Sequence, residues 1–122
     1  MEDNLDKLFV SNEDLKKDLL FELLKDKIKI TEDGEVIILG KFDPSEKIIL
    51  YCLAKKVLFA KNKVNDEPSG PAEISKKTGL PNGTSKVYAR KLEEERILVN
   101  KGGKYYIPNF MLHNLKERLK NG

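Results

Sequence analysis

The sequence has few of the residues on which disulfide, metal and membrane chemistry depends. Its 122 residues include one cysteine, one histidine and no tryptophan. A single cysteine excludes an internal disulfide and fits a reducing compartment. His113 has no cysteine or second histidine near it, so it lacks the partners that a zinc site requires. No apolar run approaches the ~20 residues that cross a bilayer, and the acidic start is unlike a signal peptide. We therefore expect a cytoplasmic protein without a metal site.

Sequence motifs of catalysis are also missing. The chain has neither a glycine-rich phosphate loop of standard spacing nor the nucleophile elbow of hydrolases. Catalysis requires a pair of positioned groups, whereas the acidic clusters here fall on helix faces that should be solvated. We therefore expect a protein that is not an enzyme and uses no cofactor, and the sequence identifies no small-molecule ligand.

The charge is divided unevenly between the two ends of the sequence. The net charge is +3, but residues 1–40 carry 6 basic against 11 acidic side chains, and residues 41–122 carry 17 against 9. An acidic front and a basic back are expected when only one part of a protein meets a polyanion. Solvated helices can carry the same uneven charge without binding any partner. The local structure predicted for the basic part therefore decides between these two interpretations.

A helix, a glycine turn, a second helix and a hairpin are predicted within the basic part. Pro71 suits the first turn of a short helix, and Gly79 suits the left-handed cap that ends it. The second helix is expected at about 82–95. Two β-rich runs, at 97–99 and 105–107, flank a stretch with two consecutive glycines, which predicts a hairpin.

In this order of elements and in several residues, the segment resembles the winged helix-turn-helix domains of archaeal and bacterial transcription regulators. The family pattern has small residues in the first helix, Gly-Leu-Pro at the turn and Gly-Thr at the start of the recognition helix. Ser85 and Ala89 depart from it, because the family usually has an apolar residue and often leucine at these positions. The resemblance covers about 44–120, and the matching residues are Ile74-Ser75, Gly79-Leu80-Pro81, Gly83-Thr84 and Leu92.

The resemblance implies an α+β, mostly helical fold. Residues 41–108 would form the winged helix-turn-helix domain, with three helices and a β-hairpin wing. A helix and hairpin at 1–40 would precede it, and a C-terminal helix at 109–122 would follow. The central helix begins at Asp43-Pro44-Ser45-Glu46, which combines an N-cap, a first-turn proline and an acid. This helix is apolar on more than one face, which makes Cys52 a small core residue.

Leucine stripes lie on both sides of the predicted domain. A helix at 12–26 carries leucines at helical spacing, and the hairpin after it turns at Asp33-Gly34, the strongest short hairpin signal. The C-terminal helix carries a second stripe. Each stripe either packs within its own chain or joins two copies in a homodimer, and the sequence does not separate these alternatives. The residues concerned are Leu15, Leu19, Leu23, Leu112, Leu115 and Leu119.

The face of the recognition helix opposite Tyr88, Ala89 and Leu92 would contact DNA. Such a helix places its N-terminal part in the major groove, where asparagine can read adenine and arginine can read guanine. The alternative is that these are ordinary solvated side chains on a helix that contacts protein instead of DNA. The predicted recognition residues are Asn82, Thr84, Ser85, Lys86, Val87, Arg90 and Lys91.

The wing is expected to be short and to contact the DNA backbone. Lysines at its tip and on the first helix would bind phosphates, which fix register without reading sequence. Tyr105 and Tyr106 alternate along their strand, so we expect one to be buried and the other exposed. The predicted phosphate contacts are Lys76, Lys77, Lys101 and Lys104.

These features together predict a small protein that binds double-stranded DNA, most plausibly a homodimeric transcription regulator associated with the nucleoid. Two alternatives remain open at this stage. One is an architectural or RNA-associated winged-helix protein, which would bind unrelated sequences equally. The other is an adaptor that docks proteins, which would show no salt-dependent binding to DNA.

Overall fold

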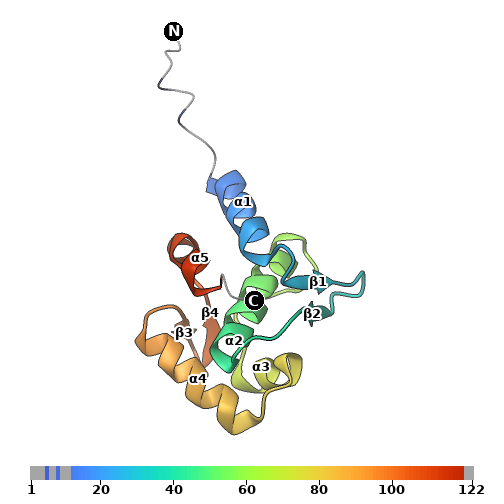
Figure 1. Cartoon of the computed structure of the whole chain (residues 1–122), viewed down its shortest axis with the longest axis vertical. Helices are drawn as coiled ribbons and strands as arrows, with labels where there is room; N and C mark the ends of the chain where they lie inside the picture. The colour runs from blue at the N-terminus through green and yellow to red at the C-terminus, as the bar shows by residue number, and fades with distance from the viewer. Residues whose placement is uncertain (1–4, 6–7, 9–11, 120–122) are drawn as a thin grey trace.

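The computed structural model describes Leu5, Leu8 and residues 12–119, with the side chains of residues 12–15 left out. The described part is an α+β fold of five α-helices, one 3₁₀ helix and two antiparallel hairpins (Figure 1). Their order is α1 (Asn12–Leu24), β1 (Ile28–Ile30), β2 (Val36–Ile38), α2 (Pro44–Ala60), α3 (Pro71–Thr78), α4 (Asn82–Glu94), β3 (Val99–Lys101), β4 (Lys104–Tyr106), η2 (Asn109–Asn114) and α5 (Leu115–Arg118).

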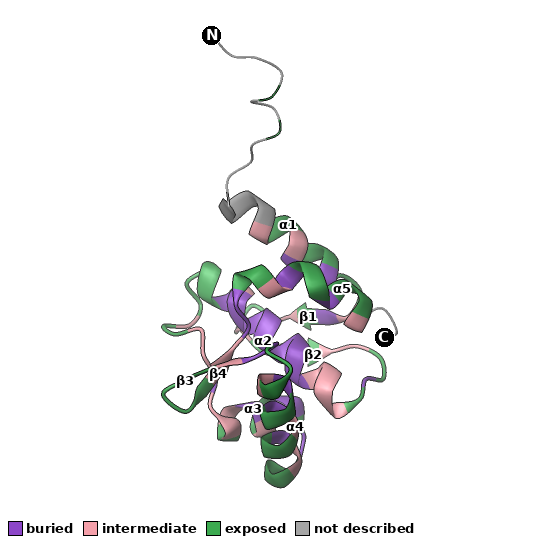
Figure 2. Ribbon diagram, turned by 90° about the vertical axis from the view of Figure 1, so that its left-hand side faces the viewer, coloured by how far each residue is buried: buried purple, intermediate pink, exposed green. Residues whose placement is uncertain are grey.

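Helix α2 lies at the centre of the molecule, between α1 on one side and α3 and α4 on the other (Figure 1). Its start confirms the predicted cap: the backbone N–H of Glu46 donates to Asp43 Oδ1 at 2.8 Å, and that of Asp43 donates to Glu46 Oε1 at 3.0 Å. This reciprocal pair is a capping box. An unbroken run from Ile48 to Lys56 is buried, as Figure 2 shows, so every face of α2 is covered by another element.

The N-terminal helix and hairpin pack onto α2. Helix α1 ends two residues earlier than predicted, because Asp26 adopts a left-handed conformation with φ 64° that no helix can continue. The predicted hairpin is confirmed, with Ile30 paired to Val36. Its loop is a turn closed by the N–H of Gly34 donating to the carbonyl of Thr31, and Gly34 has φ 88°. The N–H of Thr31 also donates to the carbonyl of Glu35, which leaves residues 32–34 as a three-residue loop with glycine in the left-handed position.

The second hairpin turns through two glycines. Lys101 pairs with Lys104, and both Gly102 and Gly103 have positive φ, 62° and 89°. A two-residue turn of this kind matches the twist of its strands. The hairpin is also joined to the segment before α3, because Ser69 and Tyr105 exchange two backbone hydrogen bonds of 2.8 Å.

The C-terminal segment is not the single α-helix predicted from the leucine stripe. It forms the 3₁₀ helix η2 followed by one turn of α-helix, α5. Leu112 and Leu115 are three residues apart, and a 3₁₀ helix places such residues on one face. Leu115 and Leu119 are four apart, as an α-helical turn requires, and all three are 1% exposed. The leucine stripe of this segment is therefore buried, although the helix type changes within it.

The leucine stripes pack within a single chain. Leu23 is 3% exposed and Leu19 is partly buried, while the side chain of Leu15 lies outside the described residues. Helix α1 contacts both α2 and η2, and Glu22 on α1 lies 3.7 Å from Lys116 on α5, so the first and last elements meet. Within the part of the chain that the structure describes, no helix is long and apolar enough for a bilayer crossing. One core cluster joins all the α-helices and η2, for example through Leu24, Ile49, Ile74, Leu92 and Leu112.

Candidate nucleic-acid interface

Helices α3 and α4 contact each other and are joined by a tight turn. Gly79 ends α3 with φ 77°, and its N–H donates to the carbonyl of Ser75. Only glycine adopts this left-handed cap without strain. Leu80 then inserts into the core at 9% exposure, and Pro81 directs the chain into α4. The Ser75 hydroxyl donates to the carbonyl of Leu80 at 2.5 Å, which fixes the turn to the helix before it.

One face of α4 is buried and the opposite face is open to solvent. Ala89 and Leu92 are buried as predicted, at 1% and 0% exposure, and Tyr88 is half-buried beside them. The opposite face is exposed along its length (Figure 2), and Thr84 at its start is half-buried. The exposed residues that the sequence predicted on this face are Asn82, Lys86, Val87, Arg90 and Lys91.

Ser85 was predicted to contact DNA, and this prediction is wrong. The side chain of Ser85 is 0% exposed, and its hydroxyl donates to the carbonyl of Asn82 at 3.2 Å. Ser85 precedes Ala89 by four residues, so helical geometry places it on the buried face. This spacing was available in the sequence and identifies Ser85 as a core position. Its hydroxyl is satisfied locally, which permits a polar residue there.

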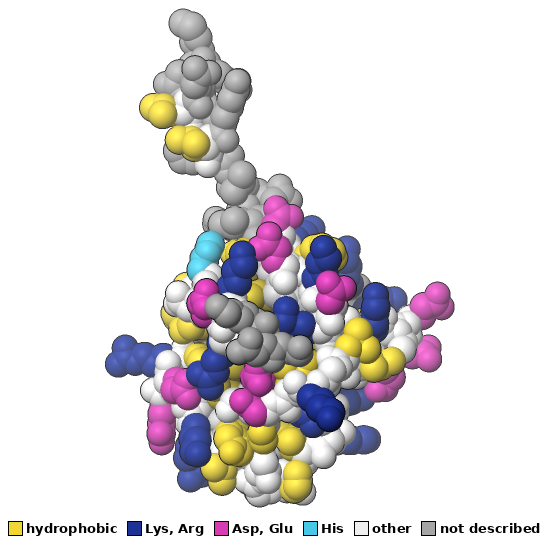
Figure 3. Space-filling model, in the orientation of Figure 1, with side chains coloured by type: hydrophobic (Ala, Val, Ile, Leu, Met, Phe, Trp, Pro, Cys, Tyr) yellow, Lys and Arg dark blue, Asp and Glu magenta, His cyan; other side chains and the backbone are white. Residues whose placement is uncertain are grey.

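After Glu73 in the first turn of α3, the interface region formed by the rest of α3, the turn and most of α4 carries only basic charged residues. From Ile74 to Leu92 the chain contains no acidic residue. On the face seen in Figure 3, the lowest part, where α3 meets the start of α4, displays basic and apolar side chains without acidic ones. Solvated basic groups on two adjacent helices create a local positive potential. The five basic residues, all exposed, are Lys76, Lys77, Lys86, Arg90 and Lys91.

Three of the predicted DNA-binding lysines contact other groups of the chain. Lys77 Nζ lies 3.3 Å from an oxygen of Glu35, at the first hairpin, and Lys104 Nζ lies 3.8 Å from Asp66. Lys91 Nζ lies 4.9 Å from the centre of the Tyr88 ring. Exposed ion pairs of this kind contribute about 0–1 kcal/mol. A phosphate can therefore replace the carboxylates at little cost.

A group of four side chains holds α3 against α2. Glu73 Oε2 accepts hydrogen bonds from Tyr51 at 2.6 Å, from Lys55 at 2.5 Å and from Ser69 at 3.2 Å. Lys55 also donates to Ser69 at 3.2 Å. The sequence had indicated only that an acid at Glu73 suits a helix start, and nothing in it showed that three donors converge there.

The pKa of the Glu73 carboxyl reflects this surrounding. Partial burial by itself would raise it, but the hydrogen bonds from Lys55 and Tyr51 and the charge of Lys55 outweigh burial, so the pKa lies below its ordinary value. The pKa of Tyr51 is raised, first by burial and then by its hydrogen bond to Glu73. At neutral pH the group therefore consists of an ionised Glu73 and a protonated Tyr51.

The β3–β4 hairpin carries Lys101 and Lys104 exposed beside its turn. The expectation that one of Tyr105 and Tyr106 is buried and the other exposed is wrong, because both are half-buried. A two-stranded hairpin covers neither of its faces completely, which explains the intermediate exposure of both rings. Burial raises the pKa of Tyr105, and the nearby carboxylate of Glu93 adds to this.

The remaining candidates for site chemistry do not form a cluster. Among the described residues, no three His, Cys, Asp or Glu side chains are placed to hold a metal ion, and His113 is exposed. Cys52 is 2% exposed, and burial raises its pKa to about 12 although Lys55 opposes the shift. A thiol in this state is a core residue and not a nucleophile.

Comparisons with protein families, with curated proteins and with solved structures gave no match to this chain. A functional assignment therefore depends on the geometry of α3, α4 and the β3–β4 hairpin.

Proposed function

We propose that the protein is a winged helix-turn-helix protein that binds double-stranded DNA, with α4 as the recognition helix and the β3–β4 hairpin as a short wing. The observation that carries this proposal is the charge of α3 and α4, where five exposed basic residues occur with no acidic residue from Ile74 to Leu92. Phosphates supply a large share of the affinity in such complexes, and they bind solvent-exposed cations of this kind.

The exposed side chains of α4 have the chemistry that base edges require. Arg90 can donate two hydrogen bonds to guanine, and Asn82 can pair with adenine. Val87 is 52% exposed, an uncommon position for a large apolar side chain, and could contact a thymine methyl group. Lys76, Lys77 and Lys91 would contact phosphates and set the register of the helix.

The far end of α4 limits how deeply the helix enters the groove. Glu94 and Glu95 are exposed there, and Glu95 accepts an ion pair of 2.8 Å from Arg118. Like charge would repel these carboxylates from phosphates. The N-terminal part of α4 is thus the part that reads DNA, while Lys101 and Lys104 of the wing lie against the backbone.

A homodimeric transcription regulator is the form of this proposal that we favour, because two half-sites give a small protein both affinity and specificity. The described leucines of the two stripes are buried within one chain, apart from Leu19, which is partly buried, so the dimer contact would use other residues. Phe110 on η2 is 70% exposed and is the largest apolar side chain available on that element.

The proposal is tested by fluorescence anisotropy with a labelled random duplex and with a duplex selected from a random pool, each at two salt concentrations. A regulator should bind both in a salt-dependent manner and bind the selected duplex at least ~10³-fold more tightly. Duplex RNA of the same sequence serves as the control for the kind of nucleic acid.

The other outcomes identify the alternatives. Equal and salt-sensitive affinities for both duplexes would indicate an architectural protein, and preference for RNA would indicate an RNA-associated one. An absence of binding at low salt would overturn the proposal and favour an adaptor that docks proteins.

A further inference from the structure

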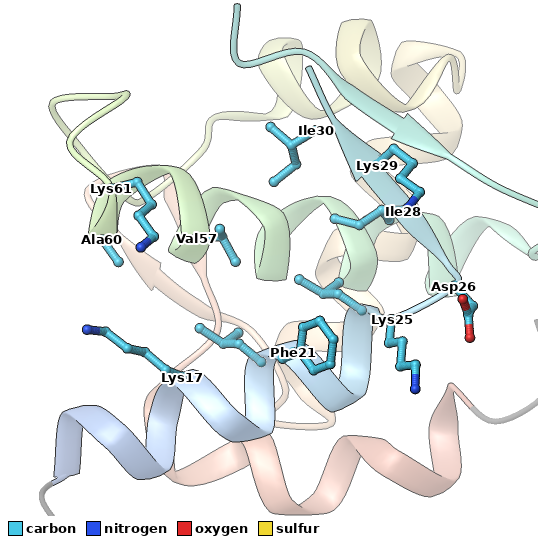
Figure 4. Close-up of a pocket in the computed structure, with 12 residues that line it drawn as sticks. Lys17, Phe21, Lys25, Asp26, Ile28, Lys29, Ile30, Val57, Ala60 and Lys61 are labelled. Atoms are coloured by element: carbon cyan, nitrogen blue, oxygen red, sulfur yellow. The ribbon is translucent and has the colours of Figure 1, made fainter. Parts of the chain in front are cut away.

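A cavity of about 560 Å³ lies between α1, β1 and the C-terminal end of α2 (Figure 4). It lies on the side of α2 that α1 covers, and α1 and α4 lie at opposite ends of the molecule in Figure 1. The volume is within the range of about 300–1,000 Å³ that is usual for small-molecule sites. No role in the proposed DNA contact accounts for it.

The walls of the cavity are apolar. Leu20, Leu24 and Ile28 are buried beneath it, whereas Phe21 at its side is 66% exposed. Val57 projects toward the opposite helix in Figure 4. Apolar surface in contact with water is unfavourable by about 25 cal/mol per Å². An apolar ligand that displaced this water would therefore be stabilised without any change in the fold.

The charged residues at the rim are four lysines and a single acid. Figure 4 places Lys17 and Lys61 at one end of the cavity, and Lys25, Asp26 and Lys29 at the other. At the first end, two cations from α1 and from the end of α2 lie on either side of the opening, and no acidic residue lines it. An anion between them would be attracted by both.

We propose that this cavity binds a free, medium-chain amphipathic carboxylate, with its apolar tail between Phe21 and Val57 and its anionic head between Lys17 and Lys61. The apolar walls and the cationic opening each match one part of such a ligand. The lining comprises 12 residues, whereas a stable protein interface takes about 20–30 residues a side. The size therefore favours a small molecule over a folded partner.

Isothermal titration calorimetry of the full chain tests this proposal, with decanoate below its micellar concentration as the probe. Decanol and decyltrimethylammonium carry the same tail with a neutral and a cationic head. We expect decanoate to bind about tenfold more tightly than decanol. A factor of ten corresponds to ~1.4 kcal/mol, which two exposed ion pairs can supply together. Decyltrimethylammonium should bind more weakly than either.

Two variants separate the head from the tail. The double variant Lys17→Gln/Lys61→Gln should lose the tenfold preference for decanoate and leave the affinity for decanol unchanged. Phe21→Ala should weaken both ligands alike. All three residues are exposed, so the fold is not at risk. The matched control Lys63→Gln/Lys116→Gln removes two exposed lysines that do not line the cavity and should change nothing.

Several results would overturn the proposal. These are no heat with decanoate, equal affinity for decanoate and decanol, or an unchanged preference in the Lys17/Lys61 variant. Binding to anionic vesicles without binding to decanoate would assign the lysines to a membrane surface instead. Self-association that Phe21→Ala abolishes would assign the apolar wall to a second copy of the chain. None of these measurements involves DNA, so their outcome is independent of the proposed function.

Discussion

Lys55 Nζ lies 2.5 Å from Glu73 Oε2, and this pair joins the middle of the central helix α2 to the first turn of α3. Lys55 is 6% exposed, so its charge has almost no access to water and depends on Glu73 for compensation. Tyr51, one turn earlier on α2, donates to the same carboxylate oxygen. The orientation of α3, and with it of the basic surface, is thus set by α2.

Replacing Glu73 with glutamine should destabilise the protein, because it leaves the buried Lys55 without a counter-charge. The Glu73 side chain is 34% exposed, so water compensates in part, and we expect a loss of about 1–3 kcal/mol in the free energy of unfolding. Urea denaturation followed by circular dichroism measures it. Glu22→Gln, which removes a carboxylate 3.7 Å from Lys116 on the surface, should change stability by less than about 0.5 kcal/mol.

Glu73 should also make stability depend on pH in the acidic range. Its pKa is lower in the folded state than the ordinary value of 4.5, so the unfolded chain takes up the proton first. The stabilisation is complete above about pH 4.5 and is lost as the pH falls through the lowered pKa. Thermal unfolding from neutral pH to about pH 3 should therefore show a steeper loss of Tm for the wild type than for Glu73→Gln. Parallel curves would contradict the lowered pKa.

The roles proposed for Arg90 and Lys76 predict different effects on DNA binding. Arg90→Ala should cost about 1–3 kcal/mol on a preferred site and relax the choice of base at one position. Lys76→Ala should weaken binding to all sequences alike. It should also reduce the slope of the logarithm of affinity against the logarithm of salt concentration by about 1, the contribution of one phosphate contact. Anisotropy titrations on selected and random duplexes measure both, with Lys116→Ala as the control for loss of an exposed charge near α1. Unchanged binding in Arg90→Ala would show that the assigned face of α4 is wrong.

Asp43→Ala should destabilise the first turn of α2. The change removes the acceptor for the Glu46 N–H, and the expected loss is about 1 kcal/mol of stability. Asp66→Ala is a suitable control for the loss of an aspartate. Asp66 is exposed, caps no helix and forms only a weak ion pair of 3.8 Å with Lys104. Equal stability of the two variants in urea would mean that the capping box contributes nothing measurable.

Cys52 should resist thiol reagents as long as the protein is folded. Because Cys52 is buried, a reagent cannot reach its sulfur, and because its pKa is about 12, almost none of it is thiolate at neutral pH. We expect iodoacetamide, with labelling followed by mass spectrometry, to react with Cys52 at least about 10³-fold more slowly in the native protein than in urea. An exposed thiol, created by Lys116→Cys in a Cys52→Ala background, should react at similar rates in both conditions. Rapid native labelling of Cys52 would show that α2 opens locally.

The elements with strong local signals were predicted well from the sequence. Asp43 with Glu46 marked the start of α2, Gly79 marked the end of α3, and two consecutive glycines marked the second hairpin. These signals depend on residues within one turn of each other. The burial of Ala89 and Leu92 followed in the same way from helical spacing. Ser85 lies one helical turn before Ala89 and shares this buried face, but its polar side chain is of the type expected on the exposed face.

Features that depend on distant residues were not predictable. Glu73 meets Lys55 only after α3 packs on α2. The 3₁₀ geometry of η2 was not predictable either, because leucines three and seven residues apart also suit one face of an α-helix. The cavity between α1 and α2 is a gap that side chains leave unfilled, and no sequence pattern encodes it. The winged-helix character and the DNA contact stay predictions until binding is measured.

Helix α1 contacts η2 and, through the ion pair of Glu22 with Lys116, also α5, so the earliest and latest elements of the described chain lie together. Bringing such distant segments together carries the largest loss of chain entropy in the fold, whereas α2, α3 and α4 meet over short loops. We expect this junction to assemble last and to exchange its amide hydrogens first, while α3 and α4 stay rigid. The molecule would therefore loosen at the end that holds the cavity and keep its basic surface intact.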